Sequence, residues 1–197
     1  MIIYHGNQEA LSDWAEVVAR LHGAGHGVLV FDYSGFGNSS GRPTPHQLRR
    51  DAWAVFHRAR ELAGPAARIY LLGFSLGAAV LMDSLARESR GAAGMILVGA
   101  YSRVRDLLPR ISPLPRWAAF LFPNLQDNLR AIAENGLPTL LVHSTDDEVV
   151  PVAQARRLAE ESGPEVRLEE VSGPGHTDFF RDSRSPYWPP VLAFLER

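Results

Sequence analysis

Short runs of apolar residues recur along the chain, and they alternate with longer stretches in which apolar residues keep a helical spacing. Each short run is continuously apolar or nearly so, which is typical of strands covered on both faces of a parallel sheet. We therefore expect strands over six runs, which are Met1–Tyr4, Gly27–Tyr33, Arg68–Gly73, Gly94–Gly99, Pro138–His143 and Val166–Glu170.

The intervals between these runs carry helix signals. Thr44 is placed as an N-cap, Pro45 occupies the first helical position, and Gly64 follows the end of the pattern. Helices are also expected over Leu11–Leu21, after the third strand, and over 151–161 and 190–196. Strands that alternate with helices predict a doubly wound α/β fold with a mostly parallel sheet of about six strands, in a single domain over residues 1–197.

One segment, at about 101–137, is longer than an ordinary connection and is rich in proline, arginine and aromatic residues. We interpret it as a short helical cap over a site; the alternative is a crossover helix with an irregular approach. Its apolar residues could line a substrate pocket or only attach the cap to the body, and they include Leu107, Leu108, Trp117, Phe120 and Phe122. Its arginines are most simply a solvated face, with anionic substrates or a membrane surface as lesser alternatives.

Composition excludes several classes of function. The chain has 197 residues, a net charge of −2 and no cysteine. Thiolate catalysis, disulfides and cysteine-ligated zinc are therefore excluded, and there is no basic footprint for nucleic acid. No apolar run approaches the roughly 20 residues that span a bilayer, and the first residues do not resemble a signal peptide. We expect a cytoplasmic location.

The segment Gly73-Phe74-Ser75-Leu76-Gly77 matches G-x-S-x-G, the nucleophile elbow, between a predicted strand and a predicted helix. The glycines allow the strand and the helix to pack closely while Ser75 adopts a strained conformation and projects its Oγ from the end of the sheet. A glycine-flanked turn with a buried hydroxyl is the alternative. The flanking strand and helix favour the elbow.

A nucleophilic serine needs a base, and the base needs an orienting acid. After an elbow, the chain order should be serine, acid, histidine. An acidic turn follows the fifth predicted strand and offers Asp146, Asp147 and Glu148, and His176 lies in a glycine-rich loop after the last strand. Both segments leave the carboxyl ends of strands, where open α/β sheets place their sites.

Five motifs resemble the α/β-hydrolase superfamily, in particular its small, short-capped serine hydrolases of the prolyl-oligopeptidase and abhydrolase-domain branches. The motifs extend over nearly the whole chain and are HGN at 5–7, FDYSGFGNSSG at 31–41, GFSLG at 73–77, HSTDDEVVP at 143–151 and GPGH at 173–176. The family acid turn reads H-G-x-x-D-x-x-V-P, so the resemblance implies Asp147 as the acid, with Asp146 as the alternative. Ser144 stands where the family has glycine.

The expected activity is hydrolysis of a small-molecule carboxylic ester by Ser75, His176 and Asp147 through an acyl-enzyme. The backbone N–H of Leu76 should bind the oxyanion, and the resemblance implies Asn7 as the second donor. Tyr33 and Phe74 are candidate pocket residues. No cofactor or metal is expected, because no dinucleotide or zinc-protease motif is present. Thioesters and small peptides or amides remain alternatives, as does a non-catalytic ligand-binding protein on the same scaffold.

The resemblance also bears on the edge of the sheet. The family sheet usually begins with two more strands, so the run Val28–Tyr33 should lie at an edge here. An open apolar edge invites pairing with another chain. We expect either a homodimer through Val28–Tyr33 or a natural chain that extends upstream of Met1.

Overall fold

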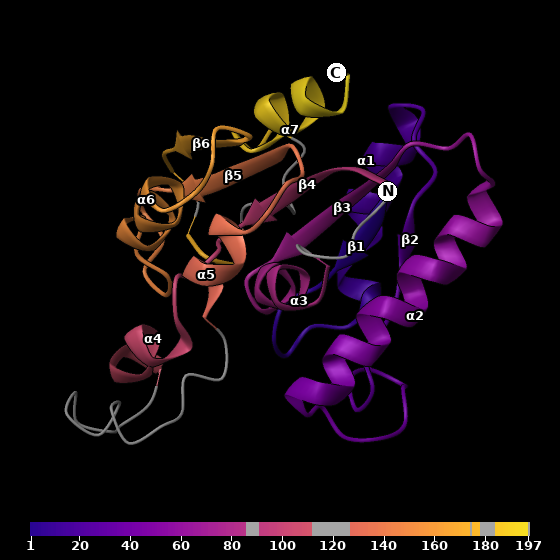
Figure 1. The fold of residues 1–197 in the computed structure, drawn as a ribbon, viewed down its shortest axis with the longest axis horizontal. Coiled ribbons are helices and arrows are strands. Elements are labelled where there is room, and N and C mark those ends of the chain that lie inside the picture. Colours follow the sequence, from indigo (N-terminus) through magenta and orange to yellow (C-terminus); the bar gives the residue numbers. More distant parts are fainter. Residues whose placement is uncertain (86–90, 112–126, 174, 178–183, 197) are drawn as a thin grey trace.

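The computed structural model describes residues 1–197 except 86–90, 112–126, 174, 178–183 and 197. Its centre is a parallel sheet with the strand order β2-β1-β3-β4-β5-β6. The strands are β1 Ile2–Tyr4, β2 Leu29–Val30, β3 Ile69–Phe74, β4 Ala92–Val98, β5 Thr139–Ser144 and β6 Val166–Val171. Helices cover both faces of the sheet (Figure 1), and the predicted doubly wound α/β fold is confirmed.

Two layers of helices follow from the alternation of side chains along the strands. Ile2 and Tyr4 point to one face and Ile3 to the other, as strand geometry requires. The helices are η1 Leu11–Trp14, α1 Ala15–Gly23, α2 Pro45–Ala63, α3 Leu76–Leu85, α4 Val104–Ile111, α5 Asn128–Ala133, α6 Ala153–Glu160 and α7 Trp188–Leu195. Helices α2, α3, α5 and α6 pack on the face of Tyr4, whereas η1, α1 and α7 pack on the face of Ile3. Among the described residues, none of the helices combines the length and the hydropathy that a membrane span requires.

Helix α2 begins and ends where the local signals predict. The Thr44 side chain accepts a hydrogen bond from the Gln47 N–H (3.2 Å), and Pro45 is the first helical residue. Gly64 follows the last residue at φ +80°, a conformation that favours glycine. Capping therefore sets the length of this helix.

Strand β2 is much shorter than predicted, because the run expected over Gly27–Tyr33 pairs with β1 only at Leu29 and Val30. Beyond Val30, the rings of Phe31 and Tyr33 pack edge-on against each other, 4.9 Å apart, and Phe31 also packs against Tyr4. Packing of these aromatic rings over the end of β1 replaces continued pairing. The strand does lie at the edge of the sheet, as expected.

The segment interpreted as a cap includes helices α4 and α5. Helix α5 belongs to the body of the fold, because Leu129 and Ile132 are buried in the main core. Leu107 of α4 is buried in a smaller cluster with Tyr101 and Val150. Residues 112–126, the middle of the predicted cap, lie outside the described residues.

The strand order places a topological switch between β1 and β3. From β1 the chain moves outward to β2, and from β3 it moves in the other direction through β4, β5 and β6. The loops after β1 and β3 therefore separate at the carboxyl ends of neighbouring strands. Open α/β sheets bind their ligands at such a point.

Candidate active site

Ser75 occupies the sharp turn between β3 and α3. Its φ of +49° is unusual for a residue with a side chain, and its N–H donates to the Val98 carbonyl (2.9 Å). A Cβ at Gly77 would lie 1.8 Å from the Tyr4 carbonyl oxygen. The glycine therefore allows the first turn of α3 to contact the end of β1, and the predicted elbow geometry is present.

Three residues from distant segments meet at this turn. The Ser75 hydroxyl donates to His176 Nε2 over 3.2 Å, and His176 Nδ1–H donates to Asp147 Oδ2 over 2.6 Å. Asp147 and His176 are buried, whereas Ser75 is half-buried. A nucleophile that contacts a base, which in turn contacts a buried acid, is the arrangement that Ser-His-Asp hydrolases use.

The acid turn holds Asp147 rigidly. Its Oδ1 accepts the N–H groups of Val149 (3.0 Å) and Val150 (2.7 Å), which leaves Oδ2 for His176. Asp146, the alternative acid, accepts instead the N–H of Gly173 (2.7 Å). The carboxylate that contacts the imidazole is therefore that of Asp147.

Ser144 and His143, which precede Asp147 in the chain, support the acid turn. Ser144, which stands in place of the family glycine, accepts the Asp146 N–H on its Oγ (3.1 Å). His143 is fully buried, its Nε2–H donates to the Val150 carbonyl (2.7 Å), and the same nitrogen lies 3.5 Å from Asp147 Oδ2. Burial lowers the pKa of His143, so this imidazole is neutral near pH 7. The sequence motif contains His143 but gave no indication of this supporting role.

The loop after β1 presents the second candidate oxyanion donor. His5 is buried, and its Nδ1–H donates to the Gly6 carbonyl (2.9 Å). Among the hydrogen bonds of the described residues, none uses the N–H of Asn7 or of Leu76. Both donors follow neighbouring strands, and Leu76 begins α3, where free N–H groups carry the positive end of the helix dipole. The two N–H groups therefore remain the candidate oxyanion donors.

Comparison with known proteins identifies the family. A family model described as serine aminopeptidase, S33, an α/β-hydrolase family, matches residues 1–135. The chain belongs to this S33 family. It is 32% identical over 187 residues to an uncharacterized protein of Mycobacterium tuberculosis, covering 90% of this chain and 63% of that protein. It is 30% identical over 183 residues to the α/β-hydrolase domain-containing protein aho-3 of Caenorhabditis elegans, covering 90% and 52%. The S33 chain thus spans between half and two thirds of these relatives.

Solved structures share the fold of this S33 protein. A monoacylglycerol lipase of Paleococcus ferrophilus has a TM-score of 0.73 at 19% identity, covering 98% of this chain and 92% of that one. Est1E of Butyrivibrio proteoclasticus, solved with ferulic acid, has a TM-score of 0.75 at 19% identity, covering 99% of this chain and 86% of that one. At this level of identity, the comparison establishes the fold.

In this S33 protein, the predicted pocket residues whose side chains the structure describes are buried. Tyr33 is fully buried, and its hydroxyl donates to the His5 carbonyl (3.4 Å), so it supports the loop after β1 and presents no accessible surface. Burial raises the pKa of Tyr33 far above its ordinary value. Phe74 is buried with its ring 5.0 Å from that of His176. Leu107 is buried away from solvent, whereas the Leu108 side chain and residues Trp117, Phe120 and Phe122 lie outside the described residues.

Within the described residues, no group of three or more histidine, aspartate or glutamate side chains is arranged to hold a metal ion.

Proposed function

We propose that this protein is a serine hydrolase that cleaves carboxylic esters through an acyl-enzyme intermediate. The observation that carries the proposal is the continuous contact from Asp147 through His176 to Ser75 at a left-handed turn. The fold neighbour named as a monoacylglycerol lipase supports the ester as the substrate class.

The reaction follows from these contacts. Ser75 Oγ attacks the ester carbonyl carbon while its proton passes to His176 Nε2, and Asp147 stabilises the imidazolium through the Nδ1–H. The N–H groups of Asn7 and Leu76 bind the oxyanion of the tetrahedral intermediate. His176 then returns the proton to the leaving alcohol. A water molecule, deprotonated by His176, attacks the acyl-enzyme and releases the acid and Ser75.

Amides and thioesters are second candidates, because the same atoms can perform the same attack on them. The family description, serine aminopeptidase, is the observation that favours an amide. A ligand-binding protein on this scaffold is the alternative of another class. It would not require the contact between His176 and Ser75, which is the reason for preferring an enzyme.

The test combines active-site labelling with a substrate panel. A fluorophosphonate probe should label the wild-type protein and not Ser75→Ala. The wild type should hydrolyse esters of graded acyl length faster than thioesters and aminoacyl amides. Ser75→Ala should lose about 10⁴-fold or more in kcat, with an unchanged circular dichroism spectrum. Labelling with preferential amide turnover would assign an aminopeptidase, and neither labelling nor turnover would leave the ligand-binding alternative.

A further inference from the structure

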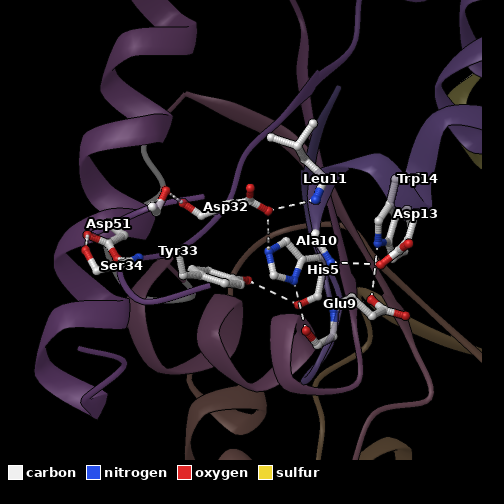
Figure 2. Close-up of polar contacts among 12 residues, drawn as sticks. His5, Glu9, Ala10, Leu11, Asp13, Trp14, Asp32, Tyr33, Ser34 and Asp51 are labelled. Carbon is white, nitrogen blue, oxygen red and sulfur yellow. Dashed lines mark hydrogen bonds and ion pairs between the residues drawn. The ribbon is translucent and has the colours of Figure 1, made fainter. Parts of the chain in front are cut away.

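Glu9 contributes a half-buried carboxylate beside the candidate oxyanion loop, and the proposed reaction does not use it. A single oxygen, Oε2, accepts two hydrogen bonds, one from the Gly6 N–H (2.6 Å) and one from the Trp14 indole N–H (3.1 Å). Figure 2 shows the Glu9 carboxylate beside the loop that carries His5 and below Trp14, whose indole nitrogen is joined to it by a dashed line. The carboxylate therefore ties the first residues after β1 to η1.

The contact leaves the loop little freedom. A Cβ at Gly6 would lie 2.9 Å from Phe74 Cδ1 and 3.0 Å from Glu9 Oε2, so the backbone of Gly6 is enclosed between the two side chains. Trp14, which donates to Glu9, also packs against Phe74, with the two ring centroids 6.0 Å apart. Phe74 in turn packs against His176. Glu9 is thus part of a continuous set of contacts that reaches the catalytic base.

Carboxylates hold further N–H groups of the same loop. The Ala10 N–H donates to Asp13 Oδ2 (2.9 Å), and the Leu11 N–H donates to Asp32 Oδ1 (2.7 Å), as Figure 2 shows. The N–H of Asn7 has no acceptor among the described residues. Carboxylates therefore hold the loop before Asn7, at Gly6, and after it, at Ala10 and Leu11, while the Asn7 N–H keeps no acceptor among the described residues.

We infer that Glu9 is a positioning residue for the oxyanion hole. By accepting the Gly6 N–H, its carboxylate fixes the backbone that leads into Asn7 and keeps the Asn7 N–H available to the oxyanion. A donor held in place before the reaction loses no free energy to reorganisation as the charge develops. The inference rests on the proposed function, because it assigns Asn7 the role of donor.

The contribution of Glu9 lies in acceptor geometry and not in its charge. A negative charge near a developing oxyanion would oppose it by Coulomb repulsion. Both donors use the same oxygen, and a glutamine amide offers one carbonyl oxygen of the same shape. Glu9→Gln should therefore preserve the function of the residue, and Glu9→Ala should remove it.

The experiment compares these two variants in steady-state hydrolysis of the best ester of the panel. Glu9→Ala should lower kcat by roughly 10- to 100-fold, less than the 10²–10³ lost with a complete donor, with little change in KM. Glu9→Gln should stay within about 3-fold of the wild type in both constants. Trp14→Phe is the matched control, because it removes the second donor to Glu9 while keeping an aromatic ring against Phe74, and it should change kcat far less than Glu9→Ala.

Inhibitor binding and hydrogen exchange distinguish a positioning role of Glu9 from a role in stability alone. An aromatic boronic acid, which forms a tetrahedral adduct on a catalytic serine, should bind Glu9→Ala more weakly by the same factor as the loss in kcat/KM. The Gly6 amide should be protected from hydrogen exchange in the wild type and in Glu9→Gln, and should lose that protection in Glu9→Ala. Where Glu9→Ala does not fold, Glu9→Asp withdraws the carboxylate by one methylene and serves the same comparison.

The outcomes separate this inference from the function on which it rests. An active wild type with unchanged kcat and boronate affinity in Glu9→Ala overturns the role of Glu9 alone. Equal losses in Glu9→Gln and Glu9→Ala overturn it too, because they would assign the effect to the charge. A wild type that takes up no fluorophosphonate and hydrolyses nothing overturns the proposed function and this inference together.

Discussion

At the scale of single residues, the acid turn divides three tasks among three neighbouring carboxylates. Asp147 binds the His176 ring, Asp146 binds the Gly173 N–H, and Glu148 accepts the N–H of His176 itself (3.3 Å). One carboxylate therefore orients the imidazole, and the other two hold the loop that carries it.

Substitutions at the two aspartates should have very different effects on activity. Asp147→Asn should lower kcat by about 10⁴-fold, because an amide can favour the wrong imidazole tautomer and cannot stabilise the imidazolium. Asp146→Asn keeps a carbonyl oxygen for the Gly173 N–H and should stay within about 10-fold. Measuring kcat of both purified variants with one ester tests which aspartate orients His176. Equal losses, or the reverse order, would transfer the orienting role to Asp146.

His143 should make the folded state sensitive to acid. Burial lowers its pKa from the ordinary 6.5, so the unfolded chain binds its proton at a higher pH than the folded protein does. The contribution of His143 to stability is therefore complete above about pH 6.5 and is lost as the pH falls towards the folded-state pKa, by at most about 1.4 kcal/mol per pH unit. His143→Gln keeps a donor for the Val150 carbonyl and removes this titration. Urea unfolding at pH 7.5 and 5.5 should show a smaller difference for the variant, and identical differences would contradict the assignment.

At the scale of elements, the contact between α3 and β1 brings the candidate oxyanion donors together. Gly77 makes this contact, since any Cβ there would meet the Tyr4 carbonyl carbon and oxygen. The backbone of β1 cannot move without disturbing its pairing with β3. The close approach of the two elements therefore sets the distance between the loop after β1 and the start of α3.

Gly77→Ala should be strongly destabilising and should also impair hydrolysis. Overpacking of this kind costs about 1–3 kcal/mol or more, and relief by a shift of α3 would move Leu76 and Ser75. Gly23→Ala is the matched control, because Gly23 is also helical and nothing lies within 4 Å of its added Cβ. It should be neutral or stabilising by up to about 1 kcal/mol. Thermal unfolding of both variants tests this, and similar melting temperatures would mean that α3 adjusts freely.

At the scale of the whole molecule, the sheet has an open edge at β2. Leu29 N–H donates to the Met1 carbonyl (2.9 Å), and successive residues of a strand turn their backbone groups to opposite sides. Val30 therefore presents its N–H and carbonyl to the open side. The strand is only two residues long, and short edge strands limit unwanted pairing.

Because the outward N–H and carbonyl of Val30 lie at the edge of the sheet, we propose that this edge pairs with a second copy of the chain in spite of the short strand. Size-exclusion chromatography with light scattering should show a dimer at high concentration, and Val30→Pro, which removes the outward donor, should shift it to a folded monomer. A wild type that stays monomeric and active at every concentration would exclude pairing, and would make the shortness of β2 the device that protects the edge.

Much of the architecture could be predicted from local sequence. The apolar runs, the caps of α2 and the glycines of the elbow act over a few residues, so the sequence predicted six strands in the right places and the turn that carries Ser75. The order of serine, acid and histidine along the chain then restricted the acid to three candidates. The family model and the fold neighbours agree with this fold.

Local sequence by itself therefore determined the elements, the strained turn and the residue types of the site, because propensity and capping depend on near neighbours. The family resemblance implied Asp147 among the three carboxylates, but only the tertiary structure shows which of them contacts His176 Nδ1, since their hydrogen bonds reach a loop almost thirty residues away. It also ended β2 at Val30, where aromatic rings pack over β1, and it gave Glu9 its two donors. These outcomes depend on contacts that exist only after distant segments meet at the switch between β1 and β3.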